Sequence, residues 1–179
     1  MLYNWRILAG TSHPNISSWA VWGFLTVLNF ATIRSLTGDW VKSLLPAANS
    51  GMCILSAIFI FRYGSIQNLS TIDQVCFWIG AVAAISRLVF KLTSKSTEFA
   101  ASFAQVLLQI SLVIGFIPTL SGTWRHPSSE PWFPWLLWTL CFSAQFFAVK
   151  FTWRGKYIDY LYPVNMALFH GAVTILAIL

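Results

Sequence analysis

Six long apolar runs, separated by short polar connectors, constrain this chain more than any other feature of its sequence. A helix that crosses a bilayer needs about 20 consecutive, mostly apolar residues. Runs of about that length cover residues 17–35, 44–63, 72–92, 97–120, 132–150 and 157–179. They are continuous, whereas the strands of a membrane β-barrel alternate over stretches of about 10 residues. The sequence therefore predicts an all-α integral membrane protein with six transmembrane helices.

Composition agrees with a chain whose main solvent is lipid. Hydrophobic residues make up 57% of the sequence and charged residues only 9%, whereas soluble domains carry about 25% charged residues. The net charge of +6 comes from 11 Lys and Arg against 5 Asp and Glu, which lie between the apolar runs. Such charges are typical of membrane-flanking anchors. We expect the lipid bilayer as a partner and no nucleic acid.

Residue types that support other chemistries are missing or scattered. Cys53, Cys76 and Cys141 lie far apart inside apolar runs, without metal-ligand spacing and without the pattern of a disulfide framework. No nucleophile stands with a base partner, and no phosphate-binding loop is present. We therefore expect no metal, no cofactor and no enzymatic activity.

The chain contains an internal sequence repeat. Trp19 and Trp22 lie 116 residues before Trp135 and Trp138, and the same offset pairs Asn29 with Gln145. Asn49 and Asn165 are a further pair at this offset, and each copy is preceded by a His-Pro dipeptide. The helices predicted at 17–35 and 44–63 are thus repeated at 132–150 and 157–179. Three predicted helices lie between the first helix of one copy and the first helix of the other. Because each helix reverses the direction of the chain, the two copies cross the membrane in the same direction, as parallel repeats do.

The repeat divides the chain into three parts. The first repeat spans residues 1–71, the unrepeated linker helix spans 72–92, and a three-helix bundle spans 97–179. The helix at 97–120 precedes the second copy, but only a short segment precedes the first. We therefore expect two bundle repeats around a linker helix, with the first bundle lacking its first helix.

The segment GFIPTLSGTWRHPSSEPWFPWLLW, residues 115–138, resembles the repeat of the SWEET, SemiSWEET and PQ-loop transporters. Pro118 stands at the proline of that motif, and Thr119 takes the place of its glutamine. The loop at residues 13–22 resembles an uncharacterised bacterial branch of the superfamily. The resemblance covers nearly the whole chain. It implies a multi-pass protein of the bacterial inner membrane.

The resemblance also implies a solute pocket between the two bundles, near the bilayer midplane. Each bundle of such a transporter gives an asparagine from its third helix, and Asn49 and Asn165 fit those places. Sugar-transporting members carry an aromatic residue late in the second helix, where Ala31 and Phe147 stand here. The expected substrate-binding residues are therefore Asn49, Asn165, Asn29, Gln145 and Phe147.

The amide side chains predicted to lie within the membrane have two possible roles. A polar side chain in hydrocarbon is costly unless it is paired, so intramembrane amides mark either a solute pocket or hydrogen bonds between helices. Trp19 and Trp22 share one helical face, as do Trp135 and Trp138. These four tryptophans are either interface anchors or a gate over the pocket. Proline removes a backbone donor and kinks a helix, so hinges or static bends are expected at Pro46, Pro118 and Pro163.

All five acidic residues fall at helix ends or in loops. A proton- or sodium-coupled carrier usually needs a carboxylate in mid-membrane, so facilitated diffusion of a small neutral, sugar-like solute by alternating access is the favoured function. The alternatives are a PnuC-like vitamin or nucleoside carrier and a membrane scaffold that binds a partner without transport. An incomplete first bundle would fit a homo-oligomer, in which a second chain fills the gap.

Membrane orientation has two conflicting indications. One side of the predicted topology holds seven basic residues and the other holds three, and the positive-inside rule assigns the richer side to the cytoplasm. The SWEET topology would place the Arg125 loop there instead.

Overall fold

The structure is a computed structural model that describes residues 4, 5, 8, 9, 16–63, 68, 70–93, 97–153 and 156–179. Within these ranges the chain is helical and has no strand. The long helices are α2 (Ile16–Thr37), α3 (Trp40–Tyr63), α4 (Thr71–Thr93), α5 (Thr97–Arg125), α6 (Trp132–Phe147) and α7 (Tyr157–Ile178). They correspond one to one with the six apolar runs, so the all-α fold predicted from the sequence is confirmed.

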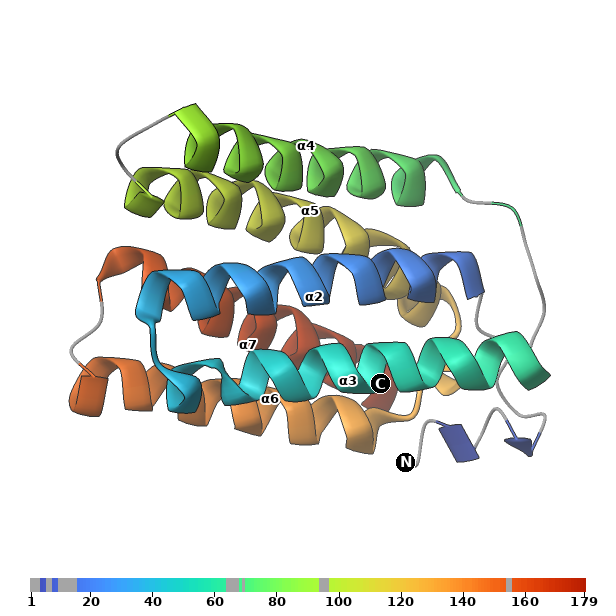
Figure 1. The fold of residues 1–179 in the computed structure, drawn as a ribbon. Helices are drawn as coiled ribbons and strands as arrows, with labels where there is room; N and C mark the ends of the chain where they lie inside the picture. The colour runs from blue at the N-terminus through green and yellow to red at the C-terminus, as the bar shows by residue number, and fades with distance from the viewer. Residues whose placement is uncertain are drawn as a thin grey trace.

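Consecutive long helices run antiparallel (Figure 1). They pack side by side in the pairs α2–α3, α4–α5 and α6–α7. The two central helices are α2, which packs against α3, α4 and α5, and α5, which packs against α2, α4 and α7. On the other side of the molecule α7 lies between α5 and α6. In this arrangement α2 and α6 run in the same direction (Figure 1), as the sequence predicts for the leading helices of two copies.

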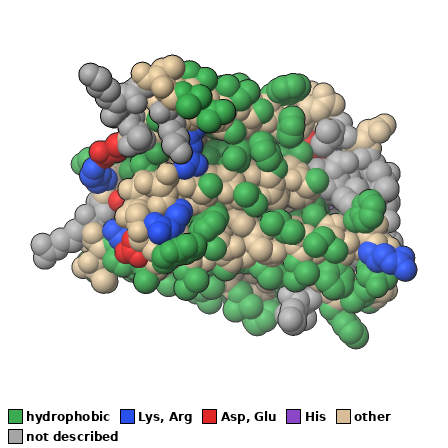
Figure 2. Space-filling model, in the orientation of Figure 1, with side chains coloured by type: hydrophobic (Ala, Val, Ile, Leu, Met, Phe, Trp, Pro, Cys, Tyr) green, Lys and Arg blue, Asp and Glu red, His purple; other side chains and the backbone are tan. Residues whose placement is uncertain are grey.

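The surface of the bundle is largely apolar. In Figure 2 hydrophobic side chains cover much of the face shown, while Lys, Arg, Asp and Glu gather toward its two ends. The helices α3, α4, α5 and α7 are each long and apolar enough to cross a membrane, and so is α6 together with the helical turn that follows it to Trp153. A surface of this kind is stable in lipid, so the fold is that of a multi-pass membrane protein.

The helix α2 differs from the other five because it is not identified as a membrane span. Its polar side chains Thr26, Asn29 and Thr32 are buried. A helix that contacts three neighbours exposes little of its surface to lipid, so polar residues are tolerated where those neighbours satisfy them.

Several helix ends lie outside the predicted limits. The helix α5 continues one turn beyond Leu120 to Arg125, with Pro118 inside it. The helix α3 begins four residues earlier than predicted, where the Asp39 carboxylate accepts a hydrogen bond from the backbone N–H of Val41 (2.7 Å) and so caps the helix. After Phe147 the chain widens into the π-helical turn η2 (Ala148–Trp153).

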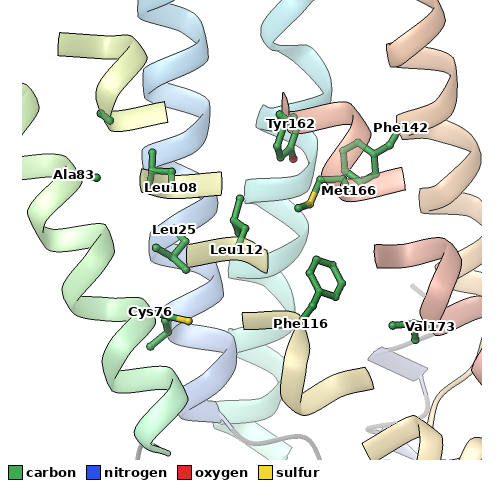
Figure 3. Close-up of a cluster of buried hydrophobic side chains, with 12 residues drawn as sticks. Leu25, Cys76, Ala83, Leu108, Leu112, Phe116, Phe142, Tyr162, Met166 and Val173 are labelled. Atoms are coloured by element: carbon green, nitrogen blue, oxygen red, sulfur yellow. The ribbon is translucent and has the colours of Figure 1, made fainter. Parts of the chain in front are cut away.

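The apolar core lies where α2, α4, α5 and α7 meet (Figure 3). Leu25 of α2 faces Leu112 of α5, and Cys76 and Ala83 approach from α4. Short polar contacts join the same helices: Ser111 Oγ donates to the carbonyl oxygen of Cys76 (2.8 Å). Such bonds satisfy hydroxyl groups that would otherwise be unpaired in an apolar interior.

The closest approach of α2 and α4 depends on Gly80. A Cβ atom at this position would lie 2.5 Å from Leu25 Cδ2 and 3.0 Å from Phe24 Cε1. Gly80→Ala should lower the free energy of unfolding by about 1–3 kcal/mol through overpacking, although alanine is the better helix former. Unfolding in mixed micelles measures the effect. The matched control is Gly51→Ala, because nothing lies within 4 Å of its Cβ position. Equal free energies of unfolding for the two variants would contradict the close packing of α2 on Gly80.

Candidate functional site

The four repeated tryptophans meet at one cavity. Trp19 and Trp22 lie in the first two turns of α2, and Trp135 and Trp138 lie in the first two turns of α6. All four line a single cavity of about 670 Å³. The equivalent starts of the two parallel helices thus form walls of the same space, which favours a role as pocket walls over one as interface anchors alone.

Small side chains on α5 leave room for this cavity. Gly115, Pro118, Thr119 and Gly122 lie on one face of the helix at three- to four-residue spacing, and all line the cavity. A Cβ atom on Gly115 would lie 3.4 Å from Trp22 Nε1, so the indole packs directly on the glycine. At Gly122 nothing lies within 4 Å of the Cβ position. Pro118 and Thr119 are therefore wall residues of the cavity.

Aromatic packing fixes the inner part of the wall. Phe116 is fully buried, with its ring centroid 4.7 Å from that of Trp22 and 6.3 Å from that of Trp135. Both contacts are edge-to-face, which is a favourable arrangement of aromatic rings. Phe116 therefore connects the tryptophans of α2 and α6 across the middle of the bundle.

His170 of α7 also lines the cavity and is only 4% exposed. Its Nδ1 atom lies 2.7 Å from the carbonyl oxygen of Met166. The ring of Phe116 lies at a centroid distance of 5.1 Å, and those of Trp135 and Phe142 each lie at 5.2 Å. The repeat pattern of the sequence does not indicate His170 as a site residue, because position 170 has no polar counterpart at the 116-residue offset.

The charged residues that line the cavity, among those the structure describes, are both acidic. Asp73 is buried at the start of α4, where its Oδ2 atom accepts hydrogen bonds from Ser18 Oγ (2.8 Å) and Ser70 Oγ (2.7 Å). Glu130 accepts a hydrogen bond from Trp135 Nε1 (3.0 Å). Within the described lining there is no Lys or Arg. The cavity therefore disfavours anions.

Beyond the cavity, amide side chains join α2 to α5 and α7. Asn29 Oδ1 accepts hydrogen bonds from Gln105 Nε2 and Gln109 Nε2, both at 3.0 Å. Gln109 Oε1 in turn accepts a hydrogen bond from Asn165 Nδ2 (3.3 Å). Asn29, Gln105 and Gln109 are all buried. The network therefore corresponds to the second role expected of these amides, in which they hold neighbouring membrane helices together.

A second polar contact separates the large cavity from a small one. Asn49 lines the large cavity and donates a hydrogen bond from Nδ2 to Tyr162 Oη (3.0 Å). Tyr162 and Gln145 line a cavity of about 20 Å³ toward the opposite end of the helices. The same small cavity is lined by Lys42 and Trp153, where the ammonium of Lys42 lies 5.8 Å from the indole centroid. The far end is therefore closed in this conformation.

The structure brings only some of the predicted residues together. The large cavity is lined by Asn49, Trp19, Trp22, Trp135, Trp138 and Pro118. Asn29 and Asn165 lie in the amide network. Gln145 and Pro163 line the small cavity, and Pro46 is buried within α3.

Phe147 lies apart from both cavities. It is 53% exposed and stacks on Phe151, whose ring centroid is 6.1 Å away. Phe147 is equivalent to Ala31 in the sequence repeat, but its side chain does not line the pocket.

The described residues contain no cluster of three or more His, Cys, Asp or Glu side chains that could hold a metal ion. Comparisons with family models, curated proteins and solved structures gave no match to this chain.

Filling the cavity from α5 should close it to water. Gly122→Leu places a side chain in open space, so the protein should stay folded while the mouth narrows. Cys141 lines the cavity, and the other two cysteines can be removed as Cys53→Ser and Cys76→Ala. We expect a small hydrophilic methanethiosulfonate to modify Cys141 quickly in this background and several-fold more slowly once Gly122→Leu is added.

The control for this measurement is Gly51→Leu, because Gly51 also has open space around its Cβ position but does not line the cavity. Equal slowing in both variants would show that the effect is not due to the cavity.

Proposed function

We propose that this chain is a membrane transporter that passes a small neutral solute by facilitated diffusion, with alternating access to one cavity. The observation that carries the proposal is that equivalent tryptophans of α2 and α6 line a single open cavity, while the far end is closed. Such an arrangement corresponds to one state of a carrier whose site is open to one side at a time.

The parallel repeat predicted from the sequence supports this function. The pairs α2–α3 and α6–α7 each pack closely, and their leading helices run in the same direction (Figure 1). Two similar helix pairs can rock about a site between them. In the proposed domain organisation, residues 1–71 form the first repeat, residues 72–92 the linker helix and residues 97–179 the three-helix bundle. The proposed family is the SWEET and PQ-loop superfamily.

The walls of the cavity suit a neutral solute that has both apolar faces and polar groups. Tryptophan rings pack against the faces of sugar-like or heterocyclic rings, while the Asn49 amide can hydrogen-bond hydroxyl groups. The two acids hold hydrogen bonds near helix ends, and Asp73 lies in the first turn of α4. Neither acid lies in the middle of a long helix, where a coupled carrier usually needs a carboxylate, and this favours uncoupled passage over proton coupling.

The cavity lies at the end of the bundle opposite to Arg34, Lys42, Lys150 and Lys156. If the lysine-rich end faces the cytoplasm, as the positive-inside rule indicates, this conformation opens away from the cytoplasm. We propose the bacterial inner membrane as the location, because the resemblance is to a bacterial branch of the superfamily.

Solute flux into liposomes tests the proposal. The purified chain is reconstituted and supplied with radiolabelled glucose, uridine or nicotinamide riboside, which also separates a sugar carrier from a PnuC-like carrier. We expect saturable flux of one class. In the double variant Asn49→Ala, Asn165→Ala we expect that flux to fall at least tenfold, because Asn49 lines the cavity and Asn165 anchors the amide network behind it.

The matched control is Asn68→Ala, because Asn68 is exposed and lies outside both cavities. Unchanged flux in a folded double variant would remove the asparagines from the solute path. If no class shows flux above that of empty liposomes, the scaffold alternative replaces transport.

A further inference from the structure

We infer that His170 is a hydrogen-bond acceptor for the solute in the large cavity, so the site takes ring-shaped solutes that carry O–H or N–H donors. The inference rests on the proposed function only in taking this cavity as the solute site. It names the solute chemistry that the cavity selects and a specificity-determining residue that the repeat pattern does not indicate.

The hydrogen bond to Met166 determines which ring nitrogen of His170 carries the proton. A backbone carbonyl oxygen can only accept, so Nδ1, which lies 2.7 Å from it, must be the donor. In the neutral imidazole the other nitrogen, Nε2, then presents a lone pair. Nε2 has no hydrogen-bond partner among the residues that the structure describes, although the side chain is 96% buried and lines the cavity.

Three of the rings around His170 hold it in place without offering it a donor, and the fourth, Trp138, lies at a centroid distance of 6.3 Å. Phe116 and Phe142 have no polar hydrogen, and the indole N–H of Trp135 donates to Glu130 (3.0 Å). Native proteins usually satisfy an acceptor in an apolar interior with a protein or water partner. Because His170 lines the cavity, a water molecule or a donor group of the solute can reach Nε2 there.

Two indole groups add the complementary donors. The N–H groups of Trp22 and Trp138 also make no hydrogen bond within the described part of the chain, and both residues line the cavity. Trp22 comes from α2 and Trp138 from α6, so the donors stand on the two halves of the proposed repeat. A hydroxyl group both donates and accepts, so one ring that bears several hydroxyl groups can satisfy His170 and the indoles together.

These features exclude other classes of solute. A ring without polar hydrogens leaves Nε2 unpaired and displaces the water that would otherwise satisfy it. An anion meets two acidic side chains and no Lys or Arg within the described lining. The cavity therefore favours polyhydroxylated rings, such as a hexose or the ribose of a nucleoside, over both their O-methylated derivatives and sugar phosphates.

Binding to the full chain in lipid nanodiscs tests the inference without requiring transport. The probes are D-glucose and uridine, each compared with its fully methylated derivative, which for uridine carries methyl groups on all three hydroxyl oxygens and on N3. Binding is read from the shift in melting temperature as probe is added. We expect at least one parent compound to stabilise the protein and its methylated derivative to have no effect. His170→Phe keeps the size and ring contacts of the side chain but removes the acceptor. It should weaken the binding of the parent about 3- to 10-fold, the value of one hydrogen bond.

Nitrogen-15 NMR of histidine-labelled protein reports on the acceptor directly. The chain has three histidines, and the signal lost in His170→Phe identifies the Nε2 of His170. That signal should move when the binding parent compound is added and stay fixed with its methylated derivative. His126→Phe is the matched control, because His126 is exposed and does not line the cavity.

Three results would overturn the inference. The first is equal affinity for parent and methylated compounds. The second is binding that leaves the His170 signal unmoved. The third is no binding by either parent compound. In each case saturable flux of another solute class in liposomes would still support transport, so the failures of the two proposals can be told apart.

Discussion

The pairing of buried amides on neighbouring helices is the constraint on which the rest of this structure depends. An unpaired amide in a bilayer is costly, so Asn29 at the centre of α2 fixes where α5 lies by accepting hydrogen bonds from Gln105 and Gln109. Through Asn165 the same network extends to α7. The three inner helices are thus held in one register, while α3 and α6 lie on the outside of this layer. The network also forms a polar barrier between the two ends of the molecule.

On one side of this barrier the helices separate enough to leave a cavity, and on the other they close. The open side depends on small residues of α5. Gly115 lets the Trp22 indole pack directly on the helix, and Gly122 leaves open space in the cavity. The closed side depends on larger contacts, including that of Lys42 with Trp153 in the π-helical turn after α6. Because these contacts join α3 to α6, a rocking of the two helix pairs would break them first. In the proposed alternating access, contacts at one end of the molecule would therefore form as those at the other end break.

Much of the fold follows from the sequence, because continuous apolar runs leave few alternatives to a helical bundle. The positions of the six helices and the shared faces of the paired tryptophans could be predicted from length and periodicity. Contacts between helices could not: whether Asn165 faces the cavity or Gln109 depends on the rotation of α7, which no local pattern records. Phe147 lies at the surface for the same reason. The importance of His170 and of the glycine face of α5 appears only when four helices are brought together.

The most direct test of the central claim is the distance between the outer helices at the closed end. Spin labels at Val41 and Phe151, both strongly exposed, would report on the separation of α3 from the turn after α6. Pulsed electron resonance in nanodiscs should give two populations of distances, the shorter corresponding to this conformation, and a transported solute should change their ratio. A single distance that stays unchanged in the presence of such a solute would contradict alternating access about this cavity.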